Sequence, residues 1–166
     1  MLLIDIAFRF KDLDFTFSAT VRRGEVHDFA TGEPALADKL FWVLCGLDQD
    51  YTGKIDGEGI CFNASSWNNV LALGDRSMFI RGSVRRNIYK ALRIRADKKT
   101  ARARTEEVIK LYNLERIAGF NINLLEDNEL TTVAMARAHY RKIGLVVCKN
   151  VEIDLTRFKD AYIIKV

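Results

Sequence analysis

The chain has 166 residues, of which 49% are hydrophobic, and a formal net charge of +4. We expect one domain with a sizeable core, and no apolar run approaches the ~20 residues of a membrane-spanning helix. Without a signal-peptide pattern, the expected location is the cytoplasm. Cys45, Cys61 and Cys148 are far apart and lack Cys-x-x-Cys spacing. They predict reduced thiols, and together with His27 and His139 they indicate no metal site.

The first 21 residues predict an antiparallel hairpin. Apolar and polar residues alternate over Ile4–Phe10 and again over Phe15–Val21, which is typical of half-buried strands. Residues 11–14 connect them.

Residues 24–47 predict a strand, a tight loop and a helix. Val26 begins a short apolar stretch, Thr31–Pro34 has turn chemistry, and the apolar residues from Leu36 to Leu47 recur at helical spacing. Pro34 suits a first helical turn. Together with Thr52–Gly57, this segment resembles the phosphate-binding region of ABC-type ATPases.

The resemblance implies a Walker A loop at residues 31–39, in which glycine amides, a lysine and a hydroxyl normally hold phosphate and magnesium. Here Pro34 and Leu36 stand in glycine positions, Ala37 in the lysine position and Asp38 in the hydroxyl position. A carboxylate repels phosphate, so we expect nucleotide binding to be absent or weak.

Four residues are the remaining nucleotide-site candidates. Phe10 lies near the family's adenine-stacking aromatic, although a core or sheet-edge position is the favoured alternative. Lys39 is two helical positions beyond Ala37, which turns it ~200° around the axis. The other two candidates are Thr31 and Gly32.

Residues 76–104 form a basic segment with eleven Lys and Arg and one acid, Asp97. A solvated helical face, a membrane-facing surface and a nucleic-acid surface all remain open. Its candidate surface residues are Arg86, Lys90, Arg93, Arg95, Lys98, Lys99, Arg102 and Arg104.

Residues 79–88, Phe-x-x-Gly-Ser-Val-Arg-x-Asn-Ile, follow an apolar strand at Val70–Leu73. They are similar to the segment after the Q-loop of ABC exporters, near which the transmembrane partner docks. Asp75 takes the place of the glutamine. The resemblance implies a docking surface formed by Met78, Phe79, Ile80, Arg81 and Arg85; the alternative is that Phe79 and Ile80 are core residues.

The last third of the chain continues the resemblance. Residues 101–120 predict one or two amphipathic helices. Leu125–Glu129 stands where the family has its signature, with three carboxylates that we expect to cap the following helix. Gly144–Cys148 predicts a buried parallel strand. Lys149 and Asn150 then replace the metal-binding Asp and the catalytic Glu.

The sequence therefore predicts an α/β, P-loop NTPase-like core at residues 1–74 and 123–166, with an antiparallel N-terminal hairpin and an inserted basic helical subdomain at 75–122. The chain is identified as a degenerate, shortened ABC transporter-type ATPase domain. The resemblance implies a non-hydrolysing subunit or remnant without a cofactor, in which weak ATP or magnesium binding remains open.

The expected partner is an ABC permease or an active ABC ATPase homologue, with a second copy of the chain and an anionic membrane surface also open. This allows a peripheral position at the cytoplasmic membrane. A nucleic-acid-associated module is the alternative function. A conventional enzyme based on His27 and Asp28 is disfavoured, because adjacent strand residues point to opposite faces, and Lys149 with Asp154 is the only other pair.

Overall fold

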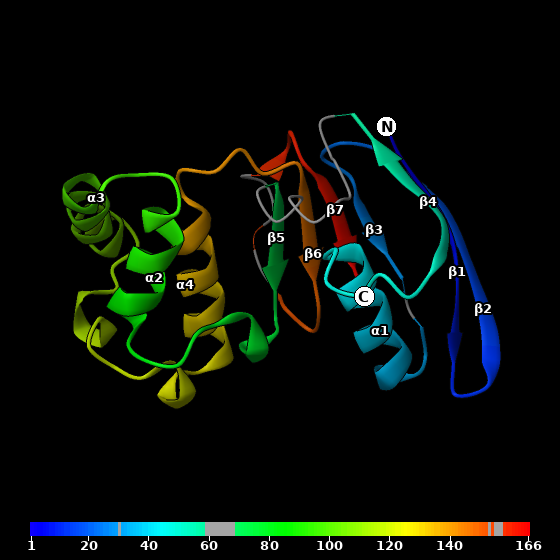
Figure 1. Cartoon of the computed structure of the whole chain (residues 1–166), viewed down its shortest axis with the longest axis horizontal. Coiled ribbons are helices and arrows are strands. Elements are labelled where there is room, and N and C mark those ends of the chain that lie inside the picture. The colour runs from blue at the N-terminus through cyan, green and yellow to red at the C-terminus, as the bar shows by residue number, and fades with distance from the viewer. Residues whose placement is uncertain (30, 59–68, 153, 155–157) are drawn as a thin grey trace. The chain divides into compact units, whose positions relative to one another are not determined.

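The computed structural model describes residues 1–29, 31–58, 69–152, 154 and 158–166. The chain divides into two compact units (Figure 1). The first comprises Met1–Leu73 and Lys142–Val166, and the second comprises Gly74–Arg141. The sequence placed the second boundary near residue 123. The structural boundary lies later because a helix that begins at Asp127 shares its core with the preceding helices.

An antiparallel sheet in the first unit contains the predicted hairpin. Its strands β1 (Leu2–Phe10), β2 (Leu13–Val21) and β4 (Thr52–Gly57) have the order β2-β1-β4. Lys11 and Asp12 connect β1 to β2 with φ values of 49° and 64°. Positive φ at both central positions is the geometry of a type I′ turn, whose twist matches that of paired strands.

A parallel sheet completes the first unit. It contains β3 (Val26–Asp28), β5 (Val70–Leu73), β6 (Leu145–Cys148) and β7 (Tyr162–Lys165) in the order β3-β7-β6-β5. All four residues of β6 are buried, which confirms the predicted buried parallel strand. The apolar residues Ile60, Cys61 and Phe62 also predict a short strand, and they lie outside the described residues.

Helix α1 (Pro34–Leu44) follows β3 and begins with the predicted proline. Its buried side chains are Leu40, Phe41, Val43 and Leu44. They belong to one apolar cluster with residues of β1, β6 and β7. The carboxyl-terminal half of the helix is therefore anchored in this core, while Pro34 and Asp38 near its amino end remain exposed.

The second unit is helical. It contains α2 (Val84–Arg93), α3 (Lys98–Leu111) and α4 (Asp127–Ala138), with 3-10 turns η2 (Arg76–Met78), η3 (Glu115–Ile117) and η4 (Ile122–Leu124). Side chains cap two of the helices: Ser83 accepts from Arg86 N, and Asp97 accepts from the amides of Lys99 and Thr100. No helix in the described ranges is long and apolar enough to cross a membrane.

Candidate functional site

Two amides in the first turn of α1 donate within the helix. The carbonyl of Glu33 accepts hydrogen bonds from the N–H groups of Leu36 and Ala37, at 3.1 and 3.0 Å. Pro34 has no N–H to offer, and Thr31 Oγ1 donates to the same Glu33 carbonyl at 3.1 Å. A phosphate cradle needs several amides directed at one anion, and those of Leu36 and Ala37 are engaged within the helix.

An ion pair joins the two positions that the resemblance assigns to magnesium coordination. Lys149 Nζ lies 2.7 Å from Asp38 Oδ1. Asp38 is in the first half of α1, while Lys149 directly follows β6, and its N–H donates to the carbonyl of Leu73 on β5. The Lys149 side chain is only 16% exposed, and its ammonium also lies 5.4 Å from the centre of the Phe41 ring. A cation of the protein itself therefore neutralises the carboxylate of Asp38.

Lys39 points to a different group of acids. Its Nζ lies 2.8 Å from Asp48 Oδ2 and 3.5 Å from Asp50 Oδ2, in the segment after α1. Burial alone would lower the pKa of Lys39, but the hydrogen bond and charge of Asp48 outweigh burial and raise it. Lys39, a candidate for the nucleotide site, is therefore paired with Asp48 and Asp50.

Lys11 brings Phe10 near the loop. Its Nζ lies 5.1 Å from the Phe10 ring centre and 2.6 Å from Glu33 Oε1. Phe10 is half-buried, with its ring edge-on to Phe15 at 6.4 Å. The structure therefore brings Phe10 near the loop that contains Thr31. Lys39 instead pairs with Asp48. The contribution of Lys11 was missed, because a turn lysine carries no pattern that indicates its partner.

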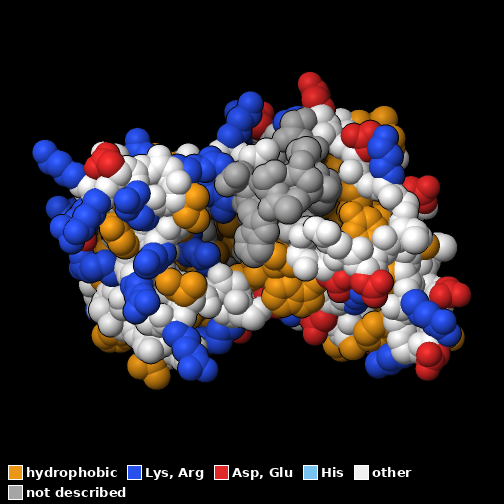
Figure 2. Space-filling view, viewed as in Figure 1, with side chains coloured by type: hydrophobic (Ala, Val, Ile, Leu, Met, Phe, Trp, Pro, Cys, Tyr) orange, Lys and Arg blue, Asp and Glu red, His pale blue; other side chains and the backbone are white. Residues whose placement is uncertain are grey.

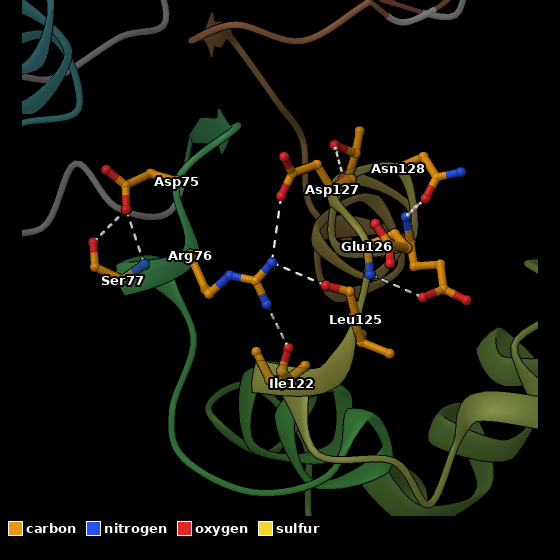
Figure 3. A network of polar contacts seen from close by, with 10 residues as sticks. Asp75, Arg76, Ser77, Ile122, Leu125, Glu126, Asp127 and Asn128 are labelled. Carbon is orange, nitrogen blue, oxygen red and sulfur yellow. Dashed lines mark hydrogen bonds and ion pairs between the residues drawn. The ribbon is translucent and has the colours of Figure 1, made fainter.

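Asp75 and Arg76 organise the start of the second unit (Figure 3). Asp75 accepts from both N and Oγ of Ser77, at 2.8 and 2.5 Å, and so caps η2. Arg76 donates to the carbonyls of Ile122 and Leu125, both at 2.9 Å, and lies 3.3 Å from Asp127. The segment in the Q-loop position is thereby tied to the segment in the signature position.

The carboxylates at the signature position begin α4, as predicted. Glu126 and Glu129 form a capping box in which the Glu129 side chain accepts from Glu126 N at 3.0 Å. Asp127 is the first residue of the helix. These acids complement the helix dipole, and their charge opposes the approach of a phosphate.

The segment that resembles a docking surface divides into supporting and exposed residues. Phe79 is half-buried against the core of the second unit, with the Arg137 guanidinium 4.9 Å from its ring centre. Arg137 also donates to the carbonyl of Met78 at 2.8 Å, and burial lowers its pKa. Ile80 is 42% exposed, and Arg81 is exposed. Ile80, Arg81 and Arg85, which is also exposed, are therefore the residues of this segment that a partner can reach.

Asn87, which sequence analysis had not singled out, fixes the backbone of Ile80. Its side chain is only 1% exposed, accepts from Ile80 N at 3.0 Å, and donates to the carbonyls of Ile80 and Ser83 at 2.9 and 3.1 Å. A buried amide that makes three such bonds holds one loop conformation. In the sequence, the asparagine of the motif at residues 79–88 was the signal that could have indicated this role.

The second unit carries fifteen Lys and Arg and eight Asp and Glu, a formal net charge of +7. Figure 2 shows these basic side chains gathered over its visible face. Arg85 pairs with Glu106 of α3, and Arg104 stacks on Tyr140 at 4.7 Å. The other predicted basic residues are all exposed: Arg86, Lys90, Arg93, Arg95, Lys98, Lys99 and Arg102.

The cysteines in the described ranges are structural. Cys45 and Cys148 are buried thiols, and burial raises the pKa of Cys148 to about 11. Cys61 lies outside those ranges, within which no group of three metal-binding side chains occurs.

The sequence matches no protein-family model and no curated protein. Solved structures do match. CbiO1 from Clostridium perfringens, described as part of the ABC transporter complex cbiONQ, is 15% identical with a TM-score of 0.64. That match covers 99% of this chain and 77% of the other. The ATP-binding cassette MJ0796, solved as a dimer in a post-hydrolysis state with ADP and phosphate, is 14% identical with a TM-score of 0.67, over 99% and 86% of the two chains. The chain therefore shares the fold of these two ATP-binding cassette structures.

Proposed function

We propose that the chain is a non-hydrolysing ABC ATPase-like subunit that docks to a transporter permease or to a catalytically intact homologue. The observation that carries this proposal is the Asp38–Lys149 ion pair. Hydrolysis of ATP in this fold needs a magnesium ion between the loop and the strand, and a carboxylate that activates water. Asp38 and Lys149 instead neutralise each other, and Asn150 cannot act as a general base.

A docking role is supported by what the solved neighbours are. One is part of a transporter complex, and the other was solved as a dimer. A module that no longer hydrolyses ATP retains a role only through a surface that binds something else. We assign Ile80, Arg81 and Arg85 to that surface, with Met78 and Phe79 as its support. An active homologue, or a second copy of this chain, is an alternative partner to the permease.

The proposed location is the cytoplasmic side of a membrane. Anionic lipid headgroups attract polybasic segments, and the second unit has a net charge of +7. The attraction brings the chain near a permease without requiring a membrane-spanning segment. Flotation with phosphatidylserine vesicles at two salt concentrations tests this location.

Calorimetry with magnesium and millimolar ATP tests the loss of nucleotide chemistry. We expect no measurable binding and no phosphate release, including for Asn150→Glu alone. A magnesium-dependent dissociation constant in the micromolar range would refute the argument from the loop. Turnover by Asn150→Glu would refute the argument from the ion pair.

Capture from detergent-solubilised membranes of the source cell tests docking. The tagged chain should retain a permease or an ATPase homologue, and Ile80→Ala should weaken that capture. Asp14→Asn, an exposed change in the first unit, is the control. Equal capture by the unmodified chain, Ile80→Ala and Asp14→Asn would contradict the assignment of Ile80 to the docking surface.

A nucleic-acid-associated module is the second candidate, favoured by the same +7 unit. Duplex DNA binding through phosphate contacts would show a log–log salt slope of about −0.9 per contact. A steep slope with micromolar affinity at physiological salt would favour this function over docking.

A further inference from the structure

A groove of about 460 Å³ lies between α2 and α3, within the second unit. Arg85, Arg86 and Tyr89 line it from α2, while Arg102 and Glu106 line it from α3. We call it the α2–α3 groove. Arginine side chains present apolar stems below a charged head, so such a groove suits a ligand that has both apolar and anionic groups.

The groove has unbalanced positive charge. Arg85 is paired with Glu106, and both of these side chains are about half exposed. Within the described part of the chain, the side chains of Arg86 and Arg102 have no ion-pair or hydrogen-bond partner. Two guanidinium groups, one from each helix, are therefore available to carboxylates.

The backbone at the start of α2 does not supply the attraction, because its amides are occupied. The N–H groups of Val84 and Arg85 donate to the carbonyls of Phe120 and Ala118, both at 3.0 Å, and Arg86 N donates to Ser83 Oγ at 3.2 Å. Recognition in the groove therefore rests on side chains.

An exposed aromatic lies at the same end of α2. Hydrogen bonds from Val84 N to Phe120 O and from Ile122 N to Gly82 O hold residues 118–122 beside the helix start. The Phe120 side chain is 49% exposed although it is large and apolar. Aromatic and arginine residues are the types that dominate binding energy at protein interfaces.

We infer that the α2–α3 groove binds an acidic segment of a partner protein, with carboxylates at Arg86 and Arg102 and an apolar side chain near Phe120. This inference rests on the proposed docking function and extends its surface from residues 78–85 onto α3. Glu106 within the groove favours spaced carboxylates over the continuous phosphates of a nucleic acid. The concave, partly apolar wall favours a peptide over a flat lipid surface.

The test uses the full chain and a fluorescent helical peptide amide that carries leucines and two glutamates four positions apart, which places both on one face. A matched peptide has glutamines instead. We expect saturable binding of the glutamate peptide and at least tenfold weaker binding of the glutamine peptide. The double variant Arg86→Gln with Arg102→Gln should lose at least tenfold in affinity, and Phe120→Ser should lose several-fold.

The matched control is Lys98→Gln with Lys110→Gln, which removes the same charge from exposed α3 positions that do not line the groove. Equal losses in the two double variants would overturn the inference, since net charge alone would then explain binding. Preference for a duplex DNA probe or phosphatidylserine vesicles, lost in the groove variant, would overturn it in favour of those anions.

Membrane capture separates this inference from the proposed docking function. Capture that is lost in Ile80→Ala but unchanged in the groove variant keeps docking and overturns the groove assignment. Groove-dependent peptide binding without any captured permease or homologue supports the groove and refutes docking.

Discussion

The Asp38–Lys149 ion pair should stabilise the fold measurably, and a double-mutant cycle with Asp38→Asn and Lys149→Met measures its contribution. The two charges are 2.7 Å apart, with side chains 52% and 16% exposed. Fully exposed pairs contribute about 0.2–1 kcal/mol, whereas removing one partner of a buried pair costs about 3–5 kcal/mol. For this half-exposed pair we expect a coupling energy of about 1–2 kcal/mol.

Asp38→Asn alone leaves a largely buried ammonium without its carboxylate. It should therefore lower the free energy of unfolding by about 2 kcal/mol, which corresponds to a fall in Tm of about 4–8 °C for a chain of this size. Adding Lys149→Met should recover part of that loss, because the uncompensated charge is gone. Urea unfolding followed by circular dichroism gives the four free energies.

The Lys54–Asp56 pair is a matched control, since its atoms are 2.5 Å apart but its side chains are 74% and 54% exposed. Its coupling energy should stay below about 0.5 kcal/mol. If the Asp38–Lys149 coupling were also below about 0.5 kcal/mol, within the error of additivity, the ion pair would not stabilise this site and our account of it would be wrong.

Three further predictions concern other contacts. Burial would raise the pKa of Asp48, but hydrogen bonds from Lys39 and Asp50 N outweigh burial and lower it from 3.8. The pKa of Lys39 is raised from 10.5. Lys39→Met should therefore destabilise the chain by about 1 kcal/mol at neutral pH. In pH-dependent urea unfolding, this difference should vanish as the pH falls through the pKa of Asp48, below 3.8, and as it rises through that of Lys39, above 10.5. Phe79→Ala should lower stability by about 2 kcal/mol, whereas Ile80→Ala should cost under about 1 kcal/mol and act on partner capture. Asn87→Ala should cost about 2–3 kcal/mol, because it leaves buried backbone groups of the Ile80 loop unpaired, and hydrogen exchange should report faster opening there.

Local patterns predicted most of the fold, because strands and helices follow from the spacing of apolar residues. The β1–β2 hairpin, the start of α1 at Pro34 and the buried strand β6 were all available from periodicity and turn chemistry. The extent of the second unit was not available from these local patterns. Its boundary depends on which cores α4 joins, and that is a property of tertiary packing rather than of local spacing.

The sequence provided candidate positions but not the contacts between them. That Asp38 and Lys149 stand in the positions of functional residues is what the resemblance implies, and it stays a prediction. The sequence could not indicate that the two meet, since 111 positions separate them. The same holds for Arg76, whose partners lie 46–51 positions away. Contacts over such distances depend on the topology, which brings the ends of separate elements together.

The ion pair also explains why single reversions toward an ATPase sequence should fail. Lys149→Asp would remove the cation that pairs with Asp38 and add a second carboxylate to the same site, where like charges repel. Asp38→Ser would instead leave the buried Lys149 ammonium without its carboxylate. Only the paired change removes both penalties, and Ala37 would still lack the ammonium that phosphate requires. We therefore expect each single change to lower stability and the paired change to be better tolerated, which urea unfolding of the three variants measures.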